Sequence, residues 1–173
     1  MFSLWSEFLR SLHQPEYVHV LLNPLPIYGL AVALLSLILA LVLRSRGAQG
    51  IALALIVATA AAAWPVAHYG SAGYDRVYSM SDASAQKWLN WHAYLADRIV
   101  WAHSVAAALA AVTLAGLWRL PRWHRPALIL TLVTTLTAVT LGGFLGFVGG
   151  KIRHAEFRHD PPPAWAHTAP DED

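Results

Sequence analysis

Histidine is the residue type through which this chain could bind a ligand inside a membrane, and each long apolar segment carries one near the same end. These residues are His19, His68, His103 and His154. An imidazole at the edge of the hydrocarbon layer is unfavourable unless it forms a hydrogen bond or binds a ligand. Imidazole nitrogens commonly bind haem iron and metal ions. The pattern therefore predicts a histidine cluster that holds a ligand, with haem or a metal ion as the candidates.

The composition limits the class of protein. The 173 residues are 57% hydrophobic and 13% charged, whereas a soluble domain has roughly 25% charged residues. This balance predicts an integral membrane protein. The net charge of +2 gives no indication of a nucleic-acid partner. Cysteine is absent, which excludes disulfides, thiolate zinc sites, iron–sulfur clusters and covalently attached c-type haem.

The lengths of the apolar runs predict four membrane-spanning helices in an all-α, up-down bundle. The expected spans are 21–43, 51–68, 95–118 and 126–150. Each is near the ~20 residues that cross ~30 Å of hydrocarbon. Pro24 and Pro26 are expected in the opening turn of the first helix, where a missing N–H costs little. Residues 1–13 have the periodicity of an amphipathic helix that lies in the membrane interface.

The domain organisation follows from the same pattern. Residues 1–158 are expected to form one four-helix membrane domain. Residues 159–173 are rich in proline and acidic groups, which is typical of a flexible tail or a segment that binds a partner.

The charges of the loops predict the orientation. The two short loops 44–50 and 119–125 contain arginine and no acidic residue, whereas all ten acidic residues lie on the other side. Because short cytoplasmic loops are enriched in Lys and Arg, both termini are expected to face outward. In a bacterial inner membrane this side is the periplasm, and all four histidines lie on it.

His103 and His154 are the preferred axial ligands of one b-type haem. His103 lies among apolar residues inside the charged pair Asp97–Arg98, and His154 follows a glycine-dense stretch. Glycines at 142, 146 and 150 leave a smooth helix face that suits a macrocycle or a neighbouring helix. A hydrogen bond to a neighbouring helix is the alternative role for His103.

The remaining candidates have supporting roles. His19 and His68 are the second choices as ligands, and Arg98 and Arg153 are expected to hold the haem propionates. His92 is expected at the surface, because it falls outside the predicted third span.

The chain also resembles a known family. His19 to Leu30 (HVLLNPLPIYGL) is similar to the H-P-x-x-V-H-F-P-I opening of a poorly characterised four-helix membrane domain family, often encoded beside c-type cytochromes. Further matches are His103 and the glycine-rich end that leads through GGKIRH to His154. Pro24 replaces the second histidine of the opening, and Val20 replaces its first proline. The resemblance implies an outer-side histidine cluster on a four-helix bundle and an association with haem or redox proteins.

Three functions are compatible with these residues. The first is a b-type cytochrome subunit in the lipid bilayer that carries electrons between the quinone pool and a periplasmic c-type cytochrome or partner complex. The second is a cofactor-free structural subunit of a larger redox or photosynthetic complex. The third is a copper or zinc protein, which requires at least three converging histidines. No nucleophile or acid–base pair indicates catalysis by this chain alone.

Overall fold

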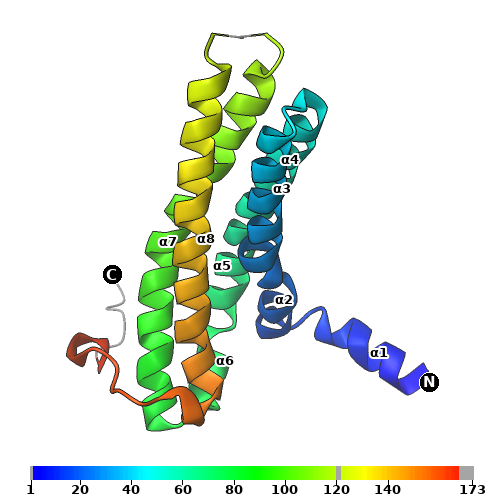
Figure 1. Ribbon diagram of the computed structural model, residues 1–173. Coiled ribbons are helices and arrows are strands. Elements are labelled where there is room, and N and C mark those ends of the chain that lie inside the picture. The colour runs from blue at the N-terminus through cyan, green and yellow to red at the C-terminus, as the bar shows by residue number, and fades with distance from the viewer. Residues whose placement is uncertain (1, 120–121, 168–173) are drawn as a thin grey trace. The chain divides into compact units, whose positions relative to one another are not determined.

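The protein is helical throughout the part that the structure describes. The computed structural model describes residues 2–119 and 122–167; it is 85% helical, and these residues contain no strand (Figure 1). The α-helices are α1 (Phe2–Ser11), α2 (Pro15–Leu22), α3 (Leu30–Val42), α4 (Arg46–Ala61), α5 (Ala63–Ala72), α6 (Tyr74–Ser79), α7 (Ala83–Gly116) and α8 (His124–Arg153). A π-helical turn, η1 (Leu25–Gly29), and two 3₁₀ turns, η2 (Ala155–Phe157) and η3 (Ala164–His167), complete the order.

Four helical stretches are long and apolar enough to cross a membrane. They are Pro15–Val42, Arg46–Ala72, Ala83–Gly116 and His124–Arg153. This confirms the prediction of an all-α, multi-pass membrane protein with four spanning helices. The observed helices extend beyond the predicted spans chiefly at the ends that carry the histidines. There, amphipathic residues continue the helix past the purely apolar run, which a hydropathy criterion does not detect.

The N-terminal helix α1 has the amphipathic character that the sequence predicts. Leu4, Trp5 and Leu9 expose 70%, 62% and 43% of their surface. Such exposed apolar side chains on a short helix suit the boundary between headgroups and acyl chains.

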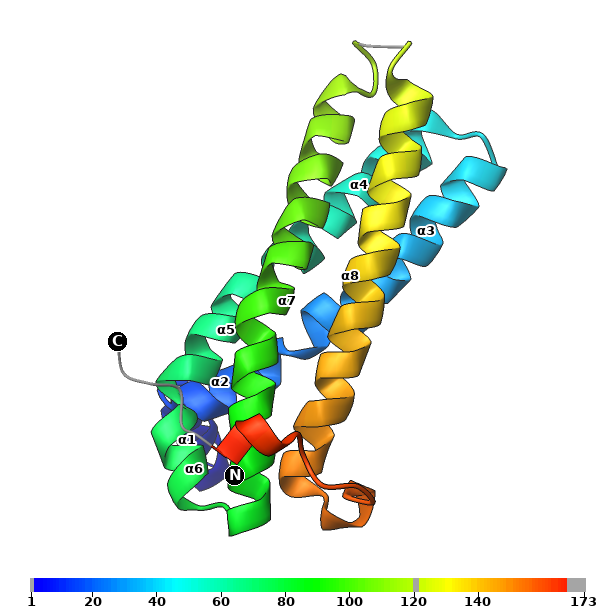
Figure 2. The ribbon, with the colours of Figure 1, turned by 90° about the vertical axis from the view of Figure 1, so that its left-hand side faces the viewer.

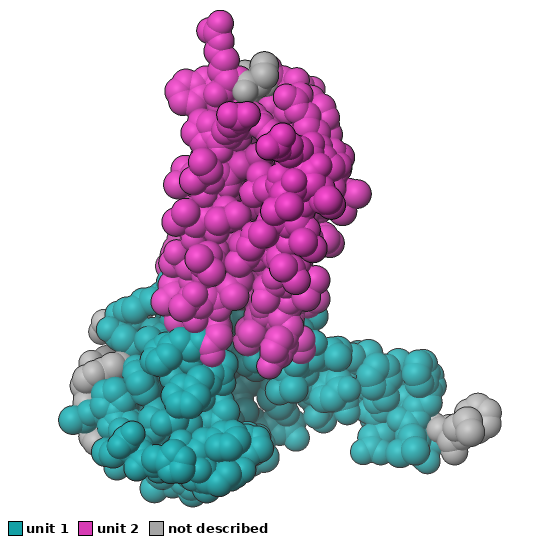
Figure 3. Space-filling view, viewed as in Figure 1, with its two compact units in different colours: residues 1–23, 65–98, 144–173 teal, residues 24–64, 99–143 magenta. Residues whose placement is uncertain are grey.

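The described chain divides into two compact units, which are coloured separately in Figure 3. Unit 1 comprises residues 1–23, 65–98 and 144–173, and unit 2 comprises residues 24–64 and 99–143. The long helices α7 and α8 each contribute one part to both units. His19, His68, His92 and His154 therefore belong to unit 1, and His103 belongs to unit 2.

Unit 2 is held together by a core of leucine, isoleucine and alanine. Leu37, Leu53 and Ile56 are fully buried between α3 and α4, which lie side by side (Figure 2). Alanines such as Ala106 and Ala110 are also fully buried, and small side chains permit close helix packing within a membrane. A hydrogen bond of 2.9 Å between Thr113 and Thr131 hydroxyls joins α7 to α8.

The prolines of the first span lie farther inside it than predicted. Because the helix begins at Pro15, Pro24 and Pro26 fall within the span and not in its opening turn. A proline lacks an N–H and clashes with the carbonyl four residues earlier, so it interrupts α-helical hydrogen bonding. The π-helical turn η1 is the local solution that lets the span continue.

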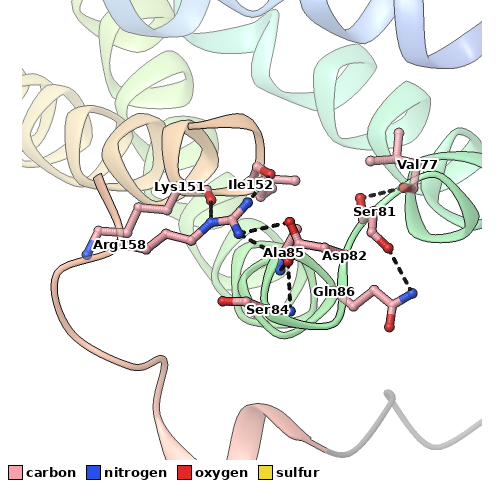
Figure 4. Close-up of polar contacts among 9 residues, drawn as sticks. All are labelled: Val77, Ser81, Asp82, Ser84, Ala85, Gln86, Lys151, Ile152 and Arg158. Carbon is pink, nitrogen blue, oxygen red and sulfur yellow. Dashed lines mark hydrogen bonds and ion pairs between the residues drawn. The ribbon is translucent and has the colours of Figure 1, made fainter. Parts of the chain in front are cut away.

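Unit 1 fixes the start of α7 through Asp82. The Asp82 carboxylate accepts hydrogen bonds from the backbone N–H groups of Ser84 and Ala85, at 2.9 and 2.8 Å, in the manner of a helix N-cap. It also pairs with Arg158, whose Nη1 lies 3.0 Å from Oδ2 (Figure 4). Arg158 donates further bonds to the carbonyls of Lys151 and Ile152. The segment after α8 is thereby attached to the beginning of α7.

We predict that this contact makes unit 1 sensitive to acid. The Ala85 N–H, followed by Arg158, lowers the pKa of Asp82. Because the folded pKa lies below the unfolded one, the stabilisation is present above the ordinary pKa of Asp and is lost as pH falls through the folded pKa. Thermal unfolding in detergent over roughly pH 3 to 6 should show this loss in the wild type.

Asp82→Asn keeps a capping side chain but removes the charge, so its unfolding temperature should vary less over this range. The pKa of Glu156 is also lowered, first by its own backbone N–H and then by His154. Glu156→Gln therefore measures the second contribution separately. Identical pH profiles for the wild type and Asp82→Asn would contradict the assignment.

The beginning of the segment expected to be a flexible tail is packed against unit 1. Ala166 in η3 is 1% exposed, and its carbonyl accepts a 3.3 Å hydrogen bond from the side chain of Asn90. The end of the tail, residues 168–173, lies outside the described residues.

Candidate functional site

Unit 1 contains a cavity of about 680 Å³, which is within the size range of small-molecule and cofactor sites. Its wall comes from α2, α5, α6, α7 and α8. Apolar and small residues form much of the lining, among them Val20, Ala67, Leu89, Ala93, Ala96 and Gly146. Two histidines, His19 and His92, also line it. Polar and charged side chains make up nearly half of the lining residues, so the space suits a ligand that combines an apolar body with polar groups.

His19 is held in a defined orientation by α5. Its Nδ1 lies 2.8 Å from the carbonyl oxygen of Val66. Since a carbonyl only accepts, Nδ1 carries a proton and donates this bond. Gly70 allows this approach, because a Cβ there would lie 2.9 Å from Nδ1. With Nδ1 engaged in this way, Nε2 is the ring nitrogen through which His19 could bind a ligand.

His92 is placed in the same way against α8. A Cβ at Gly149 would lie 3.1 Å from Cε1 and 3.2 Å from Nδ1 of His92, but 3.9 Å from Nε2. Nδ1 is enclosed without a hydrogen bond of normal length and angle, although the Leu145 backbone is close enough to interact with the ring. The Nδ1 edge of the ring thus faces α8, and its Nε2 edge is turned away from it.

Charged residues also line the cavity. Glu16 forms an ion pair with Arg76 at 2.9 Å. Asp75, Asp97 and Arg153 line the cavity as well, and all three are exposed. Arg153, which the sequence predicts as a partner of a haem propionate, lines this cavity.

Tyr74 adds a hydroxyl to the lining and links it to the C-terminal segment. Its hydroxyl donates a short hydrogen bond to Oδ1 of Asn90, whose amide in turn bonds to Ala166. Burial, and then the nearby Tyr78 and Asp75, raise the pKa of Tyr74. The phenol therefore stays protonated at neutral pH and remains a donor.

His103 belongs to unit 2 and is buried, with 3% of its surface exposed. Its Nδ1 lies 3.1 Å from the carbonyl of Ile99 on its own helix, and its Nε2 has no hydrogen-bond partner within the described chain. A Cβ at Gly142 would lie 3.2 Å from that Nε2. The predicted pairing of His103 with His154 joins residues of different units and stays a prediction.

The other predicted site residues of unit 1 do not line the cavity. His68 is exposed, and its ring packs edge-on against Tyr69. His154 stacks on Phe157 and bonds through Nδ1 to Glu156 at 2.9 Å, with about half of its side chain exposed. Arg98 lies over the ring of Tyr94, 3.4 Å from its centroid.

A metal centre with several protein ligands has no support in this geometry. No group of three or more His, Asp or Glu side chains within residues 2–119 and 122–167 is arranged to hold a metal ion. The copper or zinc alternative required at least three converging histidines.

His92 is the cavity residue that sequence reasoning placed elsewhere. It was expected at the surface because the third span was predicted to begin at residue 95, whereas α7 begins at Ala83. The signal that could have revealed it is Asp82, an N-cap residue directly before a run without proline or glycine. A helix that starts there carries His92 on its third turn.

Comparison of this chain with protein-family models, with curated proteins and with solved structures finds no match.

Proposed function

We propose that this protein is a b-type cytochrome of the bacterial inner membrane that holds one haem in the cavity of unit 1. It would pass electrons between the quinone pool and a periplasmic partner, such as a c-type cytochrome or a larger redox complex. The proposal rests mainly on His19. Its Nδ1 is hydrogen-bonded to the carbonyl oxygen of Val66, which leaves Nε2 for a ligand, and its ring lines a cavity of suitable size. A hydrogen bond from Nδ1 to a carbonyl is the usual arrangement for an imidazole ligand.

The residues present fit the chemical needs of haem. A b-type haem requires an imidazole ligand, an apolar slot and cations near its propionates. His19 would bind the iron, and Arg153 would neutralise a propionate at the charged rim. The small side chains Ala93, Ala96 and Gly146 would leave room for a flat ring. When bound, haem supplies an iron centre that gains or loses one electron.

The orientation of the proposal follows from the loop charges. Along the chain, the cavity residues come from the beginnings of the first and third spans and the ends of the second and fourth, whereas the basic short loops 44–50 and 119–125 follow the first and third spans. With those loops in the cytoplasm, the cavity would lie near the periplasmic face. This arrangement agrees with what the resemblance to the four-helix domain family implies, namely an outer-side histidine cluster.

The visible spectrum and metal content of the purified protein test this function. The protein is produced with an adequate supply of haem and purified in a mild detergent. We expect a Soret band, and α and β bands on reduction with dithionite. A colourless protein with stoichiometric copper or zinc would instead support the metal alternative. A colourless and metal-free protein would support the structural subunit and contradict the proposal.

A further inference from the structure

The structure brings a second imidazole, that of His92, to the cavity close to His19. The ring centroids of His19 and His92 are 6.4 Å apart, and their planes make an angle of 88°. Two imidazoles on opposite sides of one iron ion, each with a metal–nitrogen distance of about 2 Å, have centroids about 6 Å apart. The observed separation therefore matches that of two ligands sharing one ion.

Both rings pack against a glycine of a neighbouring helix. In each case the Nδ1–Cε1 edge lies against a glycine of a neighbouring helix, Gly70 for His19 and Gly149 for His92. The two differ in their backbone contacts, because Nδ1 of His19 bonds to the Val66 carbonyl one helical turn before Gly70, whereas Nδ1 of His92 has no hydrogen-bond partner among the described residues. Two separate helices, α5 and α8, thus orient two imidazoles on α2 and α7, and both Nε2 edges are left for a ligand.

Other roles account less well for this arrangement. A histidine that serves only in packing would satisfy both nitrogens or place one in water. The ring of His92 lines the cavity, with its Nδ1, unpaired within the part of the chain that the structure describes, on the side of α8. His68, on α5, is the contrasting case, since its ring is exposed and absent from the lining.

We propose that His19 and His92 fill both axial positions of the haem, so that the iron is six-coordinate and the site transfers electrons without binding a further ligand. This inference rests on the proposed function. When bound, the haem would take up and release one electron at a time, and His19 and His92 would hold it without forming or breaking a bond. Carbon monoxide and oxygen would then have no free coordination position.

Carbon monoxide binding to the dithionite-reduced protein tests the inference. The wild type and His68→Ala, the control on an exposed histidine, should show no CO-induced change of the Soret band. His92→Ala opens one axial position, so the reduced variant should show a CO-induced shift of the Soret band that the wild type lacks. His92→Met supplies a different axial ligand, so it should stay closed to CO and have a higher midpoint potential than the wild type.

The outcomes separate the two proposals. A wild type that contains haem and binds CO would overturn the six-coordinate assignment and leave the cytochrome proposal standing. A His92→Ala variant that retains haem and does not bind CO would likewise overturn the six-coordinate assignment and leave the cytochrome proposal standing. A wild type without haem would overturn both. If His92→Ala does not fold, the wild-type CO response and the potential of His92→Met still decide the question.

Discussion

Replacing His19 by alanine is expected to weaken haem binding by at least about tenfold, the lower end of the range for losing even the groups that support a metal ligand. His19 supplies a nitrogen whose basicity is raised by the 2.8 Å hydrogen bond from Nδ1 to Val66. The substitution removes that nitrogen and also a contact between α2 and α5. Titration of haem into the haem-depleted protein in detergent, followed at the Soret band, measures the affinity.

His68→Ala is the matched control for His19→Ala. It removes an imidazole of the same unit, and its ring is exposed and does not line the cavity. Its haem affinity should equal that of the wild type. Equal affinities for His19→Ala and His68→Ala would remove the basis for placing the haem at His19. A loss confined to His103→Ala or His154→Ala would instead favour the ligand pair expected from the sequence.

Gly149→Ala is expected to have the second-largest effect on the site. The added methyl group would lie 3.1 Å from Cε1 of His92, which is closer than normal packing permits. To relieve this contact, the ring must shift away from α8 by a few tenths of an ångström, or α7 and α8 must separate. Overpacking of this kind costs about 1–3 kcal/mol. We expect lower haem affinity and a measurable CO response in the reduced protein.

Gly143→Ala, on the same helix, provides the comparison. A Cβ at Gly143 would meet nothing within 4 Å, and alanine is a better helix former than glycine. This variant should bind haem as the wild type does and should unfold at the same or a higher temperature. If the two alanine variants behave alike in haem titration and CO binding, Gly149 does not position His92.

The spanning helices could be predicted because hydropathy reports burial in lipid directly. The four apolar runs are the centres of the observed spans, and their order and number follow from length alone. Helix ends depend on local polar chemistry instead. The N-cap at Asp82 determines where α7 begins. The π-helical turn Leu25–Gly29 lets the first span continue past its prolines.

The candidate site could be predicted only in part for the same reason. His19 and Arg153 were singled out because both fall at the outer ends of apolar runs, and both line the cavity. The glycine-dense end of α8 was expected to suit a neighbouring helix or a flat macrocycle, and Gly146 and Gly149 line the cavity. The role of His92 depends on which residues of other helices face it, and spacing along one helix does not contain that information.

The haem content of the purified wild-type protein tests the central claim most directly. The pyridine haemochrome assay, divided by the protein concentration from amino-acid analysis, gives the number of haem groups per chain. The account predicts a ratio of about one, because a single cavity of unit 1 offers imidazoles to one iron ion. A ratio near zero in cells supplied with haem would contradict it.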